Sequence, residues 1–105
     1  MKTTNREEIV NFLKDIKEVF AKKGVLIVGL FGSFATNKNN IYSDIDIAIK
    51  KDKVILQKDC AYKYFEILSE LKKEVKQTFS KNVDILDIDS KSEFLEIIKK
   101  EIIYV

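Results

Sequence analysis

Residues 30–49 constrain the possible fold of this sequence more than any other stretch does. They connect a buried strand to a strand in which apolar and polar residues alternate. The apolar run at residues 25–31 ends at Gly32-Ser33, a pair that allows a tight turn and supplies a good helix N-cap. We therefore expect a central strand, a turn and a short helix. The free N–H groups at the start of such a helix form a site for an anion such as phosphate.

The second half of this stretch predicts another strand. Residues 44–49 read Asp-Ile-Asp-Ile-Ala-Ile, and strict alternation places the isoleucines on one face and Asp44 and Asp46 on the other. Two carboxylates at this spacing lie roughly 6–7 Å apart at Cα. Their charges repel each other unless a cation lies between them. An anion cradle followed by a cation site indicates a metal–triphosphate site.

At these residues the chain resembles the polymerase-β-like nucleotidyltransferases. More narrowly, it is similar to the minimal nucleotidyltransferases (MNT), which are commonly encoded beside a HEPN-domain partner. The resemblance extends over nearly the whole chain, including the Val-Asp-Ile-Leu-Asp segment at residues 83–87 and a closing Ile-Ile-Tyr. The motifs that carry it are Gly32-Ser33-Phe34-Ala35 and Ser43-Asp44-Ile45-Asp46-Ile47.

Hydrophobic periodicity predicts the remaining elements. Their order is helix, strand, short helix, strand, helix, strand, helix, which favours one α/β (α+β) domain over residues 1–105. Its expected architecture is a small mixed sheet with helices packed on one side. The resemblance implies the same fold, with the Asp-x-Asp strand beside the strand that bears a third Asp. The expected helices span residues 5–22, 59–79 and 90–101. The expected third strand spans residues 82–88.

The resemblance also implies roles for individual residues. Asp44 and Asp46 would hold one or two Mg²⁺ ions, because hard cations prefer carboxylate oxygen. The third carboxylate maps to Asp84; Asp87, which alternation places on the opposite face of the strand, is the alternative. Nucleotide binding would fall to Gly32, Ser33 and Ser43, with ATP as the donor.

Three hypotheses about function follow. The first is an antitoxin that transfers AMP from ATP to a tyrosine of a HEPN ribonuclease, with which it forms a hetero-oligomer. The second is a non-catalytic module that inhibits its partner by direct contact. It is motivated by Thr36-Asn37, which stand where the family usually has Arg-Gly. The third is transfer to a small molecule.

Composition excludes several other classes. The chain contains 0 His, so Ser-His-Asp catalysis and histidine metal sites are excluded. A net charge of +2 and a single arginine, Arg6, argue against direct sequence-specific nucleic-acid binding. Cys60 stands alone, so we expect no internal disulfide and a cytoplasmic location. We also expect no leader peptide and no membrane span. Residues 102–105 are apolar and indicate either an interface or a final strand.

Overall fold

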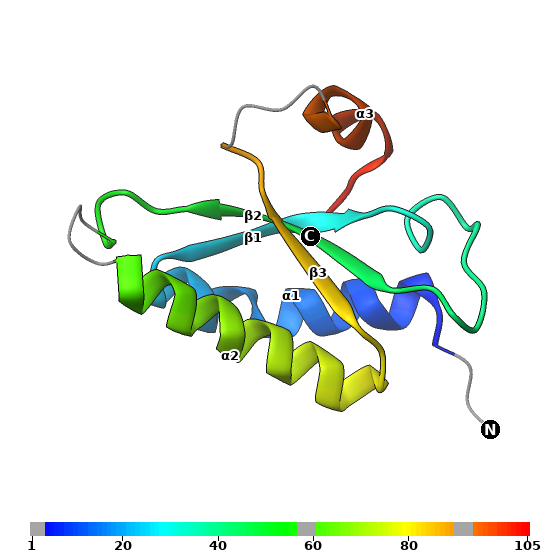
Figure 1. Ribbon diagram of the computed structural model, residues 1–105, viewed down its shortest axis with the longest axis horizontal. Coiled ribbons are helices and arrows are strands. Elements are labelled where there is room, and N and C mark those ends of the chain that lie inside the picture. Colours follow the sequence, from blue (N-terminus) through cyan, green and yellow to red (C-terminus); the bar gives the residue numbers. More distant parts are fainter. Residues whose placement is uncertain (1–3, 57–60, 90–93) are drawn as a thin grey trace.

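Four strands form one mixed sheet in the order β3-β2-β1-β4 within the part of the chain that the computed structural model describes, residues 4–56, 61–89 and 94–105. Helices pack on both faces of this sheet (Figure 1). In chain order the elements are α1 (Arg6–Lys23), β1 (Val25–Phe31), β2 (Ile45–Lys51), α2 (Ala61–Phe79), β3 (Val83–Asp87), α3 (Phe94–Glu101) and β4 (Ile103–Tyr104).

Residues at the two ends of α1 set its length. Its bounds are close to the predicted span of residues 5–22. The Asn5 side chain accepts a hydrogen bond of 2.9 Å from the Glu8 amide and so caps the first turn. Gly24 ends the helix in the left-handed region at φ 103°. Apolar residues at three- and four-residue steps predict that Val19 belongs to the buried face of this helix. This prediction is wrong, because the Val19 side chain is 52% exposed.

β1 pairs with β2 antiparallel and lies in the interior of the sheet, as its apolar sequence predicts. A bulge between Ile27 and Gly29 shifts the register of this pairing. Ile27 and Leu30 consequently both pack into the core beneath α1 and α2, while Val28 and Phe31 pack on the opposite face. The bulge therefore lets one short strand contribute to two apolar layers.

α2 packs beneath β3 and buries Ile67, Leu71 and Val75. The sequence periodicity predicts a buried stripe of Ala61, Tyr64, Phe65, Leu68, Leu71 and Val75. In the structure Ala61 is exposed and Phe65 is 64% exposed, whereas Ile67, which was not expected, is buried. Residues 57–60, including Cys60, lie outside the described residues. So do Ser90 and Glu93, whose spacing in the sequence predicts a capping box.

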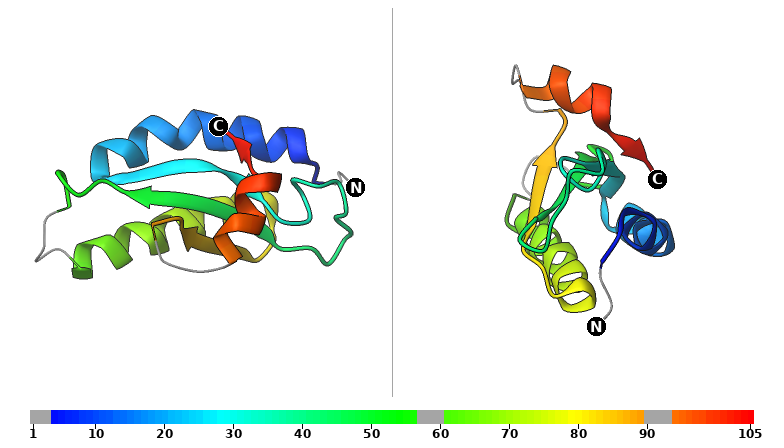
Figure 2. Two further views of the ribbon diagram at one scale, coloured as in Figure 1. Left: turned by 90° about the horizontal axis from the view of Figure 1, so that it is seen from above. Right: turned by 90° about the vertical axis from the view of Figure 1, so that its right-hand side faces the viewer.

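The fold class is confirmed as a small α+β arrangement with a mixed sheet. α1 and α2 cover one face, as expected for helices packed on one side. α3 lies on the other face (Figure 2). There Ile98 packs against Phe31 and Ala48. This correction to the one-sided packing has a clear physical cause, since Phe31 and Ala48 are apolar and need a cover on that face.

The C-terminal residues form an edge strand, which is one of the two expected alternatives. β4 pairs antiparallel with β1 through Gly29–Tyr104 and Leu30–Ile103. The Val105 amide adds a hydrogen bond of 3.1 Å to the Val28 carbonyl.

Gly29 is required by this pairing, because a Cβ there would overlap the backbone carbonyl of Ile103. A backbone group cannot swing aside as a flexible side chain can. We expect Gly29→Ala to lower the free energy of unfolding by about 1–3 kcal/mol and to weaken amide protection in β4. Urea denaturation and hydrogen exchange measure both effects. Unchanged stability and protection would contradict this role of Gly29.

No helix in the described residues combines the length and the apolar character that crossing a membrane requires.

Candidate active site

β2 presents the Asp-x-Asp pair as its alternation predicts. Ile45, Ile47 and Ile49 are each 0% exposed and anchor the strand in the core. Asp46 therefore points to the opposite face and is partly buried, while Asp44, immediately before the strand, is exposed. The buried isoleucines hold the two aspartates in a defined register.

Asp84 lies beside Asp46 because β3 runs parallel to β2. The two aspartates are direct partners in the strand register, so their side chains share one face of the sheet. Asp87 lies on the other face, where its carboxylate accepts a hydrogen bond of 3.0 Å from the hydroxyl of Tyr64 on α2. Of the two candidates for the third carboxylate, Asp84 joins the Asp-x-Asp pair and Asp87 does not.

Gly32 brings the end of β1 against Asp46. Its φ of 76° lies in the left-handed region, and a Cβ at this position would overlap the Asp46 carboxylate. Phe31 is the register partner of Asp46 on the β1 side. Residues from β1, β2 and β3 thus form one row across the sheet, in which Asp46 is central.

The short helix expected after Gly32-Ser33 is replaced by a turn. The Thr36 amide donates to the Gly32 carbonyl at 3.1 Å and the Lys38 amide donates to the Ser33 carbonyl at 2.9 Å. Arg6 holds the turn from α1 by donating to the Ala35 carbonyl at 3.1 Å. The amides of Ser33 and Phe34 have no acceptor among the described residues, so the turn still offers N–H groups to an anion.

The shape of the turn explains why Asn37 can stand where the family usually has the glycine of Arg-Gly. Asn37 adopts φ 59°, and asparagine is among the non-glycine residues that best tolerate this region. It therefore preserves a backbone shape that glycine would also adopt. Thr36 changes the chemistry, because its hydroxyl donates to the Gly32 carbonyl at 3.1 Å and carries no charge.

Ser43, which the sequence assigns to nucleotide binding, lies in the loop before β2. Its hydroxyl accepts a hydrogen bond of 2.8 Å from the Asn40 amide, and its own amide donates to the Asn40 carbonyl at 3.1 Å. Lys81 fixes the same loop by donating to the Ile41 carbonyl at 3.1 Å. In this arrangement Ser43 shapes the loop that leads to Asp44.

The position of Asp46 in the site raises its pKa. Partial burial and the neighbouring carboxylates of Asp84, Asp44 and Glu101 raise its pKa from 3.8 to about 6. Like charges gathered at a partly desolvated position disfavour ionisation. Glu101, the last residue of α3, was not predicted, because only the fold brings the end of that helix to β2.

The carboxylates of Asp44, Asp46 and Asp84 suit a hard divalent cation, because carboxylate oxygens are its preferred ligands. A bound cation would also relieve the repulsion between these carboxylates. Their side chains nevertheless stand apart: no group of three or more His, Cys, Asp or Glu in the described residues is already close enough to hold a metal. A bound ion would therefore have to draw the carboxylates together.

The raised pKa predicts how stability depends on pH in the metal-free protein. The folded state holds the Asp46 proton more tightly than the unfolded chain, whose carboxyl has the ordinary pKa of 3.8. This contribution to the free energy of unfolding is therefore present below pH 4 and is lost as the pH rises through 6. Because Asp46 is only partly buried, solvent screening limits the change to about 1 kcal/mol.

Urea unfolding between pH 4 and 7 measures this effect. We expect Asp46→Asn, which cannot ionise, to lose this part of the pH dependence and to be more stable than the wild type at pH 7. Identical pH profiles for the two proteins would contradict the charge cluster around Asp46.

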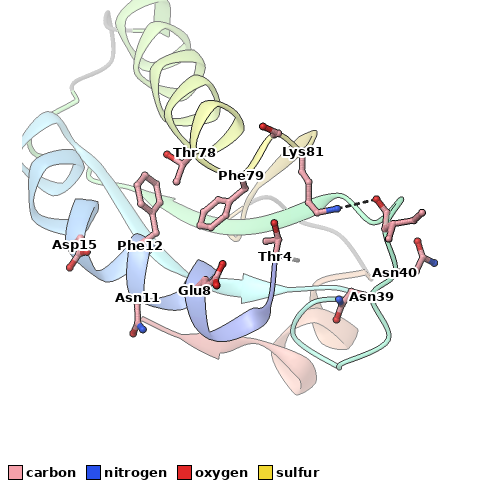
Figure 3. Close-up of a pocket in the computed structure, with 12 residues that line it drawn as sticks. Thr4, Glu8, Asn11, Phe12, Asp15, Asn39, Asn40, Thr78, Phe79 and Lys81 are labelled. Carbon is pink, nitrogen blue, oxygen red and sulfur yellow. Dashed lines mark hydrogen bonds between the residues drawn. The ribbon is translucent and has the colours of Figure 1, made fainter. Parts of the chain in front are cut away.

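Another hollow in the described part of the chain lies away from these residues. It has a volume of about 1090 Å³ and runs between α1, the end of α2 and the loop at residues 39–41. Phe12 and Phe79 meet edge-on in it with ring centroids 5.5 Å apart, and Lys81 reaches the loop from its rim (Figure 3). None of the predicted site residues lines it.

A second pocket, of about 620 Å³, is lined by Asp44 and Asp84 together with lysines of α2. These lysines were not predicted from the sequence, since a charged helix face by itself indicates only solvent exposure.

Comparison with solved structures gives the same fold. A structure described as a minimal nucleotidyltransferase matches with a TM-score of 0.75 and 18% identity, covering 100% of both chains. A toxin–antitoxin structure with AMP-PNP matches with a TM-score of 0.59 and 22% identity, covering 96% of this chain and 72% of that one. A mutant of the toxin–antitoxin pair MntA–HpeT matches with a TM-score of 0.56 and 19% identity, covering 96% and 71%.

Comparison with curated proteins gives no match. The family model described as polymerase beta, nucleotidyltransferase, matches residues 14–105, which include every residue of the row across β1, β2 and β3. The chain belongs to the polymerase-β nucleotidyltransferase family.

Proposed function

We propose that this protein is a metal-dependent nucleotidyltransferase that moves AMP from ATP to a tyrosine hydroxyl of a HEPN ribonuclease and so acts as its antitoxin in the cytoplasm. One observation carries the proposal: Gly32, Asp46 and Asp84 form a continuous row on one face of the sheet. Phosphate-binding backbone and cation-binding carboxylates are thereby adjacent.

Each predicted site residue has a chemical role in this proposal. Asp44, Asp46 and Asp84 would hold one or two Mg²⁺ ions, which when bound neutralise phosphate charge and lower the pKa of the attacking hydroxyl. Asp84 either completes this site or accepts the proton of the hydroxyl. Gly32 and Ser33 bind the β- and γ-phosphates through backbone N–H groups and the serine hydroxyl. Ser43 supports nucleotide binding by holding the loop.

The structural neighbours support this assignment in two ways. One toxin–antitoxin neighbour contains AMP-PNP, an analogue of ATP. The mutant MntA–HpeT pair carries two aspartate-to-glutamate changes two positions apart, which is the spacing of Asp44 and Asp46. The first favours ATP as the donor, and both favour a toxin as the partner.

The second candidate is a non-catalytic antitoxin that inhibits its partner by contact. Thr36 favours it, since a neutral side chain stands where the family usually has an arginine, and its hydroxyl bonds back to the Gly32 carbonyl. Loss of that positive charge would weaken contacts to a triphosphate.

Intact mass of the co-expressed partner distinguishes the two candidates. The partner is incubated with this protein, ATP and Mg²⁺, and an Asp44→Ala/Asp46→Ala variant is treated in parallel. Whole AMP increments with the wild type alone are the expected result. No increment, with the partner inhibited equally by both proteins, would overturn the transferase proposal and favour the binding module.

A further inference from the structure

The pocket beside Asp84 joins the predicted active site to a basic face of α2. Its volume is about 620 Å³, and Asp44 and Asp84 line it. β3 is the last strand at this side of the sheet, so the pocket lies at the sheet edge rather than over its centre. The other lining residues are Ser69, Lys72, Lys73, Lys76, Asn82 and Val83.

The three lysines of this pocket form one patch of positive charge. Lys72 and Lys76 are four residues apart and Lys73 and Lys76 three apart, so all three lie along the same side of the helix. All are exposed. The one ion pair seen in the described part of the chain, Lys23 with Glu70 at 2.7 Å, involves none of them. Their charge is therefore available to an anionic ligand.

If the proposed function holds, the order of residues across the sheet indicates on which side of the reacting phosphate the lysine patch lies. Gly32 lies on the β1 side of Asp46 and Asp84 lies on the β3 side. Phosphoryl-type transfer proceeds with the attacking and leaving oxygens roughly in line on opposite sides of phosphorus. If the leaving pyrophosphate lies toward Gly32-Ser33, the attacking hydroxyl arrives from the side of Asp84. The lysine pocket opens on that side.

We propose that this lysine pocket binds an acidic segment of the acceptor protein, next to the tyrosine that is modified. Carboxylates flanking that tyrosine complement Lys72, Lys73 and Lys76 and hold its hydroxyl near Asp84. The proposal rests on the proposed function and adds to it how the acceptor is recognised.

Two observations favour a protein over a nucleic acid as the occupant. Among the described residues, no aromatic side chain lines the pocket, whereas single-stranded nucleic acids bind on aromatic stacking platforms. The chain also has a net charge of only +2, which is too little for the extended phosphate contacts of nucleic-acid binding.

A titration followed by NMR tests the inference without requiring transfer. The ¹⁵N-labelled protein is titrated with a short peptide that has a tyrosine flanked by glutamates, and with the same peptide flanked by lysines. We expect amide shifts at residues 69–76 and 82–84 with the acidic peptide alone, weakening as salt rises. Lys72→Glu/Lys76→Glu should weaken binding by at least about tenfold.

Lys14→Glu/Lys22→Glu is the matched control, because it makes the same change in net charge at exposed positions of α1. It should bind the acidic peptide as the wild type does. With the partner protein as acceptor, Lys72→Gln/Lys76→Gln should raise its KM and leave kcat and the Kd of ATP unchanged.

Three results would overturn the inference: shifts confined to other elements, equal weakening by both double charge reversals, or stronger shifts of the same amides by an RNA oligonucleotide. A wild-type protein that binds the acidic peptide in this pocket but modifies no protein would contradict the transferase proposal and would still support the lysine pocket as a binding site for an acidic segment of the partner.

Discussion

Replacing Asp44 and Asp46 together by asparagine is expected to lower the rate of transfer at least about a thousandfold. That loss corresponds to about 4 kcal/mol of transition-state stabilisation, the scale of losing bound metal charge. The free energy of unfolding should not fall, because the substitution also removes the cost of burying a charged Asp46 and the carboxylate repulsion, which together raise its pKa. Initial rates of partner modification and urea unfolding of the same samples measure the two effects.

The third carboxylate provides a matched comparison within this prediction. Asp84→Asn should lose most activity, since Asp84 is the register partner of Asp46. Asp87→Asn should retain activity and lose about 1 kcal/mol of stability, because it weakens the hydrogen bond from Tyr64. Equal losses of activity in the two variants would contradict the assignment of Asp84.

Gly32→Ala should lower transfer by about a hundredfold or more and stability by about 1–2 kcal/mol. The added Cβ overlaps the Asp46 carboxylate and the residue must adopt φ 76°. A displacement of about 1 Å at a catalytic group can by itself cost this much rate. Both quantities are measured at a temperature at which the variant is fully folded.

Gly24→Ala is the control for this substitution. Gly24 also has a positive φ, of 103°, and a Cβ there would press on the side chain of Leu56. It ends α1 away from the carboxylates, so the variant should lose stability and keep its activity per folded molecule. Full activity in Gly32→Ala would contradict the tight contact between Gly32 and Asp46.

The elements predicted best are those with local signals at both ends. Asn5 and Gly24 bracket α1, and the alternation at residues 45–49 defines the β2 face that carries Asp46. The turn after Gly32 was predicted as a helix because a Ser N-cap and a tight glycine favour one. In the structure the chain instead turns through Asn37 at φ 59°.

Features that depend on distant segments could not be predicted in the same way. The choice between Asp84 and Asp87 follows from the parallel register of β3 on β2, which no local pattern specifies. The packing of α3 on the second face depends on Phe31 and Ala48, which lie on two other elements. Glu101 approaches Asp46 only through that packing.

The position of a bound Mn²⁺ ion shows directly whether Asp44, Asp46 and Asp84 form a metal–nucleotide site. Paramagnetic broadening of the ¹⁵N-labelled protein is followed with Mn²⁺ and a non-hydrolysable ATP analogue, with Mg²⁺ as the diamagnetic reference. Our account predicts that amides near Gly32, Asp46 and Asp84 broaden first, and that Asp44→Asn/Asp46→Asn abolishes the effect. Broadening centred on any other part of the molecule, or unchanged in that variant, would contradict a metal–nucleotide site on this row of residues.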